Sequence, residues 1–521
     1  MTNQARESKV PTVETLVLCP ASQRAALARE MQLIDPNQAV EVGEDITVLQ
    51  AIRSHKVRFR LHFVHSAEEA RQAIRRRYFH IMVVDDSNQT CAHTGTGLIF
   101  EAHRALRDDD SLVSPWRWDR TLVLLPDAPC KVDMAFQTGR LGLGGYDVRP
   151  LSAQRFYSRL WEIAQRRANV GKIALCLAGG GIEGLIYEMG VLRAIDTALD
   201  NASVTDFDIY CGISAGAILS SVLVNHVPVD QFRLAFERDS PAVAPVTQST
   251  IFDFDIKEYL ARMGQMVYGL SRLKKGPAGA MSLALRSVPV GFFGGDRIEA
   301  HIRNELKRAG RTNDFRRLDK ELYIGTTDQD TWEHIVFGEK GWEDVPISEA
   351  VRASMALVPF YTPKWIRGRW FVDGSFTRTT ELDVAVGKGA TLVVIVDPLI
   401  PIRSTVSGYV KAKGGVFSII QGLKALVHTR FKEGMGRALE RYPEVDFFVF
   451  KPEQDDMRLM SGSPLKYHYR LEIERIAYHR TLERILEDFV RFQGDWGRHG
   501  LLLNKERIEQ EIQRIHRDEQ S

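Results

Sequence analysis

The first third of the chain alternates short apolar runs with stretches of helical periodicity. Between positions 57 and 63, apolar residues alternate with Arg58, Arg60 and His62, which is the pattern of a strand buried on one face. Ser66 precedes Ala-Glu-Glu, which is typical of a capped helix start. Apolar runs with the length of buried strands are 15–19, 80–84 and 121–125, and a closing helix is expected over 153–167. Strands that alternate with helices predict a doubly wound parallel sheet over residues 1–168.

A second series of apolar runs begins after residue 171. Residues 172–178 form one such run, which leads directly into a glycine-rich stretch at 179–184 and then into helical periodicity. Later runs are apolar enough for strands that are buried on both faces of a parallel sheet; they are 390–396 and 446–450. We therefore expect a second α/β domain over 171–455, followed by a helical extension over 456–521.

An insertion at about 245–296 interrupts this second domain. It places Tyr259, Met263 and Val267 at helical spacing and follows them with a basic cluster at 272–275. Apolar faces, methionines and basic residues suit an interfacial helix that lies on lipid. A helical cap packed on the core fits the pattern equally well, and a cap that opens at a membrane surface would combine both interpretations.

Residues 209–220 carry the first candidate chemistry. Ser214 lies between a predicted strand end and a small-residue helix, inside Gly212-x-Ser214-x-Gly216. Such a turn is a nucleophile elbow, which exposes a serine hydroxyl at the N-terminus of a helix. A lone string of this kind is common by chance, so its meaning depends on the sequence around it.

The glycine-rich stretch upstream supplies that context. A strand, a glycine turn and a helix present free backbone N–H groups, here those of Gly179, Gly180, Gly181 and Ile182. A nucleotide-phosphate loop would require G-x-G-x-x-G or a G-K-[ST] ending, and neither is present. The sequence therefore favours an oxyanion hole, which binds the charge that develops on an attacked carbonyl oxygen.

A serine nucleophile also requires a base. The aromatic and β-branched run 369–373 ends in Asp373-Gly374, and a carboxylate at a strand end lies where open α/β sheets place their sites. An ordinary Asp-Gly turn is the alternative. A histidine base would instead make a Ser-His-Asp esterase, but the candidate histidines have no motif around them; they are His226, His301, His334 and His428.

These motifs together resemble the patatin-like phospholipases. The order Gly-Gly-Gly-x-x-Gly, Gly-x-Ser-x-Gly, Ala-Ser with a nearby Pro, and Asp-Gly covers roughly residues 171–455. The resemblance implies a three-layer α/β/α hydrolase with a Ser-Asp dyad, in which Ser214 is the nucleophile and Asp373 the base. It also implies an oxyanion hole built from the glycine-rich loop. Glu183 stands where many members carry Arg or Lys, which leaves the preferred ester open.

The N-terminal region resembles a response-regulator receiver domain, a flavodoxin-like fold, over about residues 12–168. Asp85 falls where that family has its phosphoacceptor. Cys19-Pro20-Ala21 replaces the acidic pair that would bind magnesium, and Arg149 replaces a lysine. The resemblance therefore implies a pseudo-receiver that docks or dimerises, with a structural role for Asp85 favoured over phosphorylation.

Composition narrows the remaining possibilities. The 521 residues are 44% hydrophobic and 26% charged, with a net charge of +2, so no global charge favours nucleic acid or an anionic membrane, and any attraction to a membrane must come from a local patch. No apolar stretch is long enough to span a bilayer, and the N-terminus lacks the apolar core of a signal peptide. Five scattered cysteines suggest reduced thiols. We expect a cytoplasmic protein without cofactor or metal, in transient peripheral contact with membranes.

Two functions from different classes follow. The first is a lipid acyl hydrolase that cleaves carboxylic esters of phospholipids or related lipids, with an N-terminal domain that regulates it, binds a protein partner or self-associates. The second is a signalling scaffold with a dormant hydrolase fold. The intact Ser214, Asp373 and glycine triplet favour the first.

Overall fold

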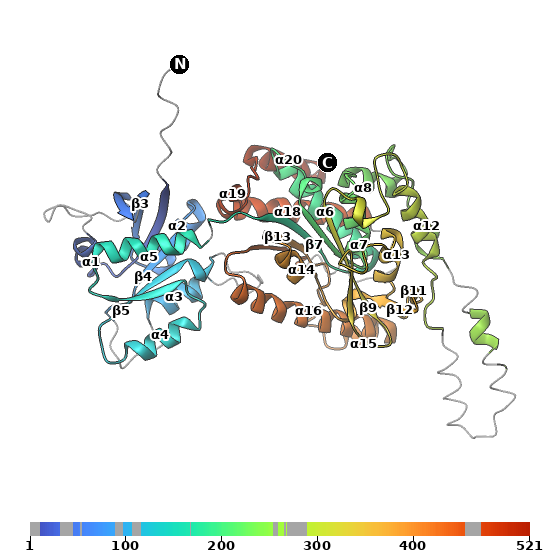
Figure 1. The fold of residues 1–521 in the computed structure, drawn as a ribbon, viewed down its shortest axis with the longest axis horizontal. Helices are drawn as coiled ribbons and strands as arrows, with labels where there is room; N and C mark the ends of the chain where they lie inside the picture. The colour runs from blue at the N-terminus through green and yellow to red at the C-terminus, as the bar shows by residue number, and fades with distance from the viewer. Residues whose placement is uncertain are drawn as a thin grey trace, which may run out of the picture. The chain divides into compact units, whose positions relative to one another are not determined.

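The structure is a computed structural model, and two compact units make up the chain (Figure 1). Unit 1 consists of Met1–Val170, Leu439–Glu444 and Asp488–Gly500, and unit 2 of Gly171–Ala438, Val445–Glu487 and Leu501–Ser521. The structure describes residues 11–31, 45–52, 55–88, 97–106, 116–166, 168–253, 259–264, 267, 289–453 and 470–520.

Unit 1 is built on a six-stranded sheet in the order β2-β3-β1-β4-β5-β6. All neighbours are parallel except β2, which pairs antiparallel with β3. Without β2, the order is that of flavodoxin-like doubly wound sheets. The strands are β1 (Thr12–Leu18), β2 (Asp45–Ile52), β3 (His55–Val64), β4 (Ile81–Asp85), β5 (Thr121–Pro126) and β6 (Gly145–Arg149). The predicted doubly wound sheet is confirmed, and β2 is an edge strand that the apolar pattern did not indicate.

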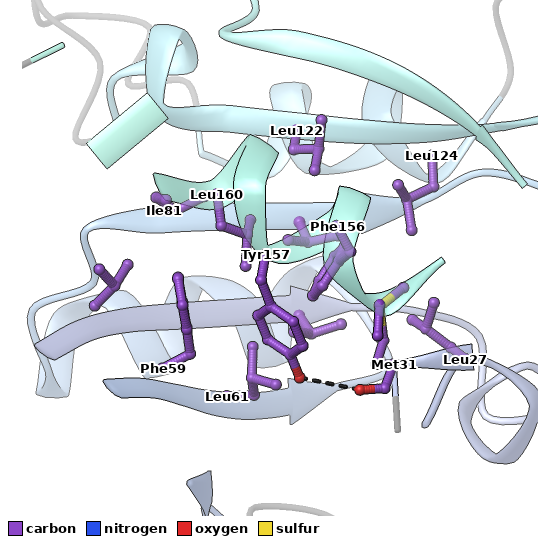
Figure 2. Packing of buried hydrophobic residues seen from close by; sticks show 14 of the residues in the cluster. Leu27, Met31, Phe59, Leu61, Ile81, Leu122, Leu124, Phe156, Tyr157 and Leu160 are labelled. Atoms are coloured by element: carbon purple, nitrogen blue, oxygen red, sulfur yellow. Dashed lines mark hydrogen bonds between the residues drawn. The ribbon is translucent and has the colours of Figure 1, made fainter. Parts of the chain in front are cut away.

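Helices cover both faces of this sheet. One buried cluster joins the sheet to α1 (Arg24–Glu30) and α5 (Ala153–Gln165), where Tyr157 packs on Phe59 and donates a hydrogen bond of 3.2 Å to the Met31 carbonyl (Figure 2). A second cluster lies on the other face, against α2 (Ala67–Arg76), α3 (Leu98–Ala105) and α4 (Lys131–Gly139). The half-buried strand expected at 57–63 is confirmed, because its apolar residues are all fully buried in the first cluster.

A helix from the far end of the sequence completes unit 1. In α19 (Phe489–Arg498), the buried Asp495 accepts hydrogen bonds from Arg120 at 2.5 Å and from Tyr78 at 2.9 Å. Burial opposes the ionisation of Asp495, but the charges of Arg120 and Arg491 and the hydrogen bonds from Arg120 and Tyr78 together outweigh it and lower the pKa of that carboxyl. The pattern of the sequence predicted a helix here, but nothing in it assigned the helix to the N-terminal sheet.

Replacing Asp495 with Ala is expected to destabilise unit 1 by about 3–5 kcal/mol, because Arg120 would remain buried without its counter-charge. The pKa of Asp495 is lowered in the folded state, so the stability it contributes is present above the unfolded pKa and is lost as the pH falls. Urea denaturation of the full chain at several pH values measures this effect. Asp119→Ala, which removes an acid that pairs with the neighbouring Arg117, is the control. Equal losses in the two variants would contradict the prediction.

Unit 2 is built on an eight-stranded mixed sheet in the order β11-β12-β9-β8-β7-β13-β14, with β10 paired to β9. Its centre is parallel, whereas β10 and β12 run antiparallel to β9. The strands are β7 (Lys172–Leu177), β8 (Ile209–Ile213), β9 (Glu321–Asp328), β10 (His334–Phe337), β11 (Lys364–Ile366), β12 (Arg369–Asp373), β13 (Ala390–Val396) and β14 (Asp446–Phe450). The parallel strands expected at 172–178, 390–396 and 446–450 are all present.

Helices lie on both sides of this sheet and make the expected three-layer α/β/α arrangement (Figure 1). The helices that contribute residues to the candidate site described below are α6 (Gly181–Ala198), α7 (Ala215–Leu223), α8 (Val229–Glu237), α9 (Gln248–Ile251), α12 (Asp296–Glu305), α13 (Ile347–Ser354) and α16 (Gly415–Arg441). Further helices in the described part of unit 2 are α14 (Leu382–Gly387), α15 (Tyr409–Ala412), α18 (Arg470–Glu487) and α20 (Lys505–Gln520). Among the described residues, no helix is both long and apolar enough to cross a membrane.

Most of the insertion at 245–296 lies outside the described residues; within it, Leu260, Met263 and Val267 are exposed. The expectation of five reduced thiols is wrong for Cys130, which is disulfide-bonded. Cys19, Cys176 and Cys211 are free and buried, because the strands and strand end that carry them lie inside the two sheets.

Candidate active site

Ser214 occupies a sharp turn between β8 and α7. Its backbone has φ 54° and ψ −118°, which an L-residue with a side chain rarely adopts. The flanking glycines are required for close packing: a Cβ on Gly212 would lie 2.5 Å from the Gly216 carbonyl oxygen, and one on Gly216 would lie 2.4 Å from the Leu177 carbonyl oxygen. The turn is therefore strained at the serine itself, as in a nucleophile elbow.

Ser354, at the end of α13, holds this turn. Its hydroxyl accepts a hydrogen bond of 2.9 Å from the Ser214 N–H and donates one of 2.6 Å to the Gly325 carbonyl of β9. Because both bonds are buried, they fix the backbone of the serine against the neighbouring strand. The Ala-Ser motif in the sequence pointed to this residue, but its role as a support for the elbow is visible only in the fold.

The glycine-rich loop lies directly against Ser214. A Cβ on Gly179 would be 3.1 Å from the Ser214 Cβ, and one on Gly180 would be 2.8 Å from the Pro398 ring. Gly181 begins α6 with φ 62°, a conformation that favours glycine. No carbonyl or side chain among the described residues accepts a hydrogen bond from the N–H groups of 179–182, so these donors remain available at the start of a helix.

Asp373 is the last residue of β12 and is completely buried. Its Oδ1 accepts hydrogen bonds from the Ser375 N–H at 2.9 Å and from the Ser375 hydroxyl at 2.6 Å. Burial raises the pKa of the carboxyl, and interactions with the side chains of Ser375 and Ser214 oppose that rise only in part. A carboxylate with a raised pKa is a stronger base than an exposed one, and here it faces the candidate nucleophile.

The strand register explains how residues 159 positions apart meet. Ile213 of β8 pairs with Gly325 of β9, and Asp373 of β12 pairs with Thr326, the next residue of β9. The absence of a side chain at Gly374 permits the approach, because a Cβ there would lie 2.4 Å from the Gly325 carbonyl oxygen. β12 is antiparallel to the central strands, so the carboxylate reaches the site from the opposite direction to the one that the sequence analysis assumed.

The candidate histidines take other positions. His334 is hydrogen-bonded to Thr377 and Glu381, and His226 to Asp319, both outside the site. His301 lines the same cavity as Ser214, and burial lowers its pKa. No histidine among the described residues forms a hydrogen bond with Ser214 or Asp373.

Ser214 and Asp373 open into an apolar cavity of about 150 Å³. A cavity of comparable size lined by Leu, Ile and Phe stays dry and binds apolar molecules. Its apolar walls include Ile218, Val222, Phe232, Phe236, Phe293, Ile302, Met355 and Phe360. The site therefore joins a buried Ser-Asp pair to a space that suits a hydrocarbon chain.

Two charged side chains also line this cavity. Glu183, which is buried, directly follows the glycine-rich loop, and Lys424 belongs to α16. Burial lowers the pKa of Lys424, while the charges of Glu183 and Asp397 raise it. Glu183, which stands where many patatin-like phospholipases carry Arg or Lys, is thus accompanied in the cavity by a lysine from α16.

Glu188, on α6, is fully buried, and neither carboxylate oxygen has a hydrogen-bond partner among the described residues. Burial, together with the nearby Asp397, raises its pKa well above the usual value, so the protonated form is favoured in the fold. The stability of the fold is therefore unaffected by this group at low pH, and part of it is lost as the pH rises through the raised pKa of Glu188.

Glu188→Gln is therefore expected to change the melting temperature little at acid pH and to raise it at alkaline pH. Thermal unfolding of both proteins across pH 5–10 measures the difference. A variant that is less stable than wild type at alkaline pH would contradict a neutral, buried Glu188.

One cluster of side chains away from this cavity has the types of ligand atom that bind metal ions. His479 and Glu483 of α18 and His516 of α20 bring their ligand atoms within 4.8 Å of one another, a combination that suits zinc. The other oxygen of Glu483 is held by Arg480 at 3.1 Å. None of these residues lines the cavity of Ser214, so the chemistry considered below does not involve them.

Comparisons with known proteins agree with this geometry in part of the chain. Residues 175–386 match the family model described as patatin-like phospholipase. A curated relative, the cGAMP-activated phospholipase of Pseudomonas aeruginosa strain BWHPSA011 / Pa011, is 35% identical over 69 residues, which are 13% of this chain. The chain spans about a fifth (20%) of the length of that relative.

Among solved structures, VipD from Legionella pneumophila is similar to this chain. The two are 14% identical with a TM-score of 0.26, and the similarity covers 60% of this chain and 66% of the VipD chain. The type III effector ExoU has 17% identity and a TM-score of 0.25 over 61% of this chain and 53% of that one. The segment that matches the patatin-like phospholipase family model, residues 175–386, contains the glycine-rich loop, the elbow and the Asp-Gly turn.

Proposed function

We propose that the protein is a lipid acyl hydrolase that cleaves carboxylic esters of phospholipids or related acyl lipids through a Ser214-Asp373 dyad. The observation that carries this proposal is the buried Asp373 carboxyl beside the strained Ser214 turn, with both residues lining one apolar cavity. The family match over 175–386 supports the same reaction class.

The chemistry has two stages. Asp373 accepts the proton of the Ser214 hydroxyl as its oxygen attacks the ester carbonyl, and the N–H groups of the 179–182 loop stabilise the oxyanion. Such a donor is worth about 3–4 kcal/mol of barrier. Asp373 then protonates the leaving alcohol, and an acyl-enzyme remains on Ser214. Asp373 then takes a proton from a water molecule, whose oxygen attacks this ester. As the intermediate collapses, the fatty acid leaves and Asp373 returns the proton to the Ser214 oxygen.

The apolar side chains that line the cavity would bind the acyl chain of the lipid before the reaction. The side chains from α7, α8 and α12 would surround an acyl chain, and each buried methylene contributes about 0.8 kcal/mol. Glu183 directly follows the glycine-rich loop and its charge interacts with that of Lys424, so this pair would face the polar part of the lipid. A headgroup with charges of both signs fits this pair better than a purely anionic one.

A direct test exposes the purified full chain to a fluorophosphonate probe and maps the labelled peptide. The modified residue is expected to be Ser214. An extract of total cellular lipid is then incubated with untreated and probe-inactivated protein, and released fatty acids and lysolipids are identified by mass spectrometry. Absence of both labelling and lipid release would favour the dormant scaffold, while labelling elsewhere would contradict the assignment of Ser214.

The N-terminal unit is proposed to act as a pseudo-receiver that regulates the hydrolase or binds a protein partner, including a second copy of the chain. Asp85 is buried, and its carboxylate is held by Arg149 at 2.7 Å and by the Ser87 hydroxyl at 2.6 Å. Arg149 also pairs with Glu30 at 2.5 Å. A phosphoryl group at Asp85 would have to displace this buried guanidinium.

Acetyl phosphate with magnesium is accordingly expected to leave Asp85 unmodified. Intact-mass measurement of the full chain before and after treatment checks this, with an active receiver protein as the positive control. Two features would prevent phosphorylation: the guanidinium of Arg149 on Asp85, and the lack of an acidic pair that binds magnesium. Arg149→Lys removes only the first, because it restores the lysine of the receiver family. A stable phosphoprotein in the unsubstituted chain would contradict the pseudo-receiver interpretation.

A further inference from the structure

The stretch between Pro398 and Lys432 has an unusual charge. It contains Arg403, Lys411, Lys413, Lys424, Arg430 and Lys432 and not a single Asp or Glu, in a chain whose 69 basic and 67 acidic residues nearly balance. We call residues 398–432 the basic segment. A block of one sign in an otherwise neutral protein creates a local potential that attracts an anionic partner.

Much of this charge is available to solvent. Lys411, Lys413 and Lys432 are exposed, and none of them forms an ion pair with a described residue. The Lys413 ammonium lies 5.0 Å from the centre of the Tyr409 ring and 5.4 Å from that of Phe417. Cations combined with aromatic rings in this way suit the boundary between water and lipid, where the Tyr409 hydroxyl and the lysine ammonium can stay hydrated while the apolar parts of the side chains contact lipid.

The same segment exposes large apolar side chains. Val406, Ile419 and Leu426 are 66%, 70% and 72% exposed. Ile419 and Leu426 are seven residues apart on α16, so they lie on one face of that helix. A helix with exposed apolar residues among lysines and arginines is typical of segments that lie in the plane of a membrane surface.

The opposite side of α16 faces the candidate active site. Gln421, Lys424 and Val427 line the cavity that contains Ser214 and Asp373. Arg430 donates hydrogen bonds to the carbonyls of Ser375 and Phe376, directly after the candidate base. One helix thus connects the exposed basic and apolar surface to the wall of the cavity, across a helix diameter of about 10–12 Å.

We propose that the basic segment is the surface by which this protein docks on an anionic lipid bilayer, so that the cavity receives its lipid from that surface. This proposal rests on the proposed function, since it assigns the place where the same substrate is captured. The occupant is a lipid surface rather than a nucleic acid, because exposed Ile, Leu and Val side chains gain nothing from a phosphate backbone but insert into an acyl layer.

The test uses the full chain with Ser214→Ala, so that the lipid is not consumed. Binding to phosphatidylcholine vesicles is compared with binding to phosphatidylcholine vesicles containing phosphatidylglycerol, by co-sedimentation at low and high salt. We expect binding to the anionic vesicles alone, weakened by salt. Lys411→Glu/Lys413→Glu/Lys432→Glu is expected to lower the bound fraction at least tenfold, and Ile419→Asp/Leu426→Asp to lower it several-fold.

The matched control is Lys307→Glu/Lys340→Glu, which reverses two exposed lysines of unit 2 outside the basic segment. Equal effects of control and test substitutions would overturn the proposal, as would salt-independent binding or competition by DNA at similar affinity. Hydrolysis of a soluble short-chain ester by the same charge variants, carrying Ser214, is expected to stay within twofold of wild type. Vesicle binding without any ester hydrolysis would contradict the proposed function and leave the docking surface intact.

Discussion

Ser214→Ala is expected to lower ester hydrolysis by about 10⁴-fold or more and to abolish fluorophosphonate labelling. The size of the loss follows from the removal of the only atom that can form the acyl-enzyme in the proposed reaction, which leaves only binding and the oxyanion donors. The variant is also expected to fold normally, because Ser214 is held in the turn by its backbone N–H, which donates a hydrogen bond to the Ser354 hydroxyl. Steady-state hydrolysis of a soluble ester and thermal unfolding measure the two effects.

Ser221→Ala is the matched control for this variant. Ser221 lies on the same helix, is fully buried and donates its hydroxyl proton to the Ile218 carbonyl. It is expected to retain activity within a few-fold. Substantial hydrolysis by Ser214→Ala, or equal losses in both variants, would show that another group is the nucleophile.

Asp373→Asn is expected to lower turnover by about 10⁴-fold, because an amide of the same shape cannot accept the serine proton. The buried carboxyl has a raised pKa, so wild-type activity is expected to rise with pH as the carboxylate forms, and then to level off. The variant is expected to lose this rising limb. A pH-rate profile of both proteins with a soluble ester measures the change.

The stability of the same variant provides an independent readout. A folded pKa above the unfolded value means that Asp373 costs stability as the pH rises through the folded pKa. Asparagine removes that cost, so Asp373→Asn is expected to match or exceed the melting temperature of wild type at alkaline pH. A loss of activity accompanied by a large loss of stability would instead indicate a structural role for Asp373.

Asp397→Asn separates the base from other buried carboxylates. Asp397 also follows a strand, and burial raises its pKa to about 6, but it accepts a hydrogen bond from the Leu399 N–H and lies outside the lining of the cavity. It is expected to keep most of the activity. Full activity in Asp373→Asn, or equal losses in the two Asn variants, would exclude Asp373 as the specific base and reopen the histidine alternative, of which His301 is the member that shares the cavity.

Local patterns were sufficient for several parts of this protein. The apolar alternation at 57–63 and the runs at 172–178 and 390–396 predicted strands that the structure contains, because burial on one or both faces imposes those patterns directly. The elbow around Ser214 and the glycine-rich loop could also be recognised in the sequence, because close backbone contacts exclude side chains at Gly180, Gly212 and Gly216 and so require glycine there.

Other features depend on contacts between distant segments and leave no local pattern. The sequence by itself indicated the two α/β sheets and the elbow, because each follows from local burial or local steric limits. The candidate residues of the dyad came from the order of the motifs, through the resemblance to patatin-like phospholipases. The tertiary structure decided that Ser354 supports the elbow, that β12 delivers Asp373 antiparallel to the central strands, and that α19 joins unit 1 through Asp495. It also decided that α16 forms a wall of the cavity. These arrangements required the fold because strand register and the pairing of buried charges are set by the packing of whole elements, and not by the residues next to them in the chain.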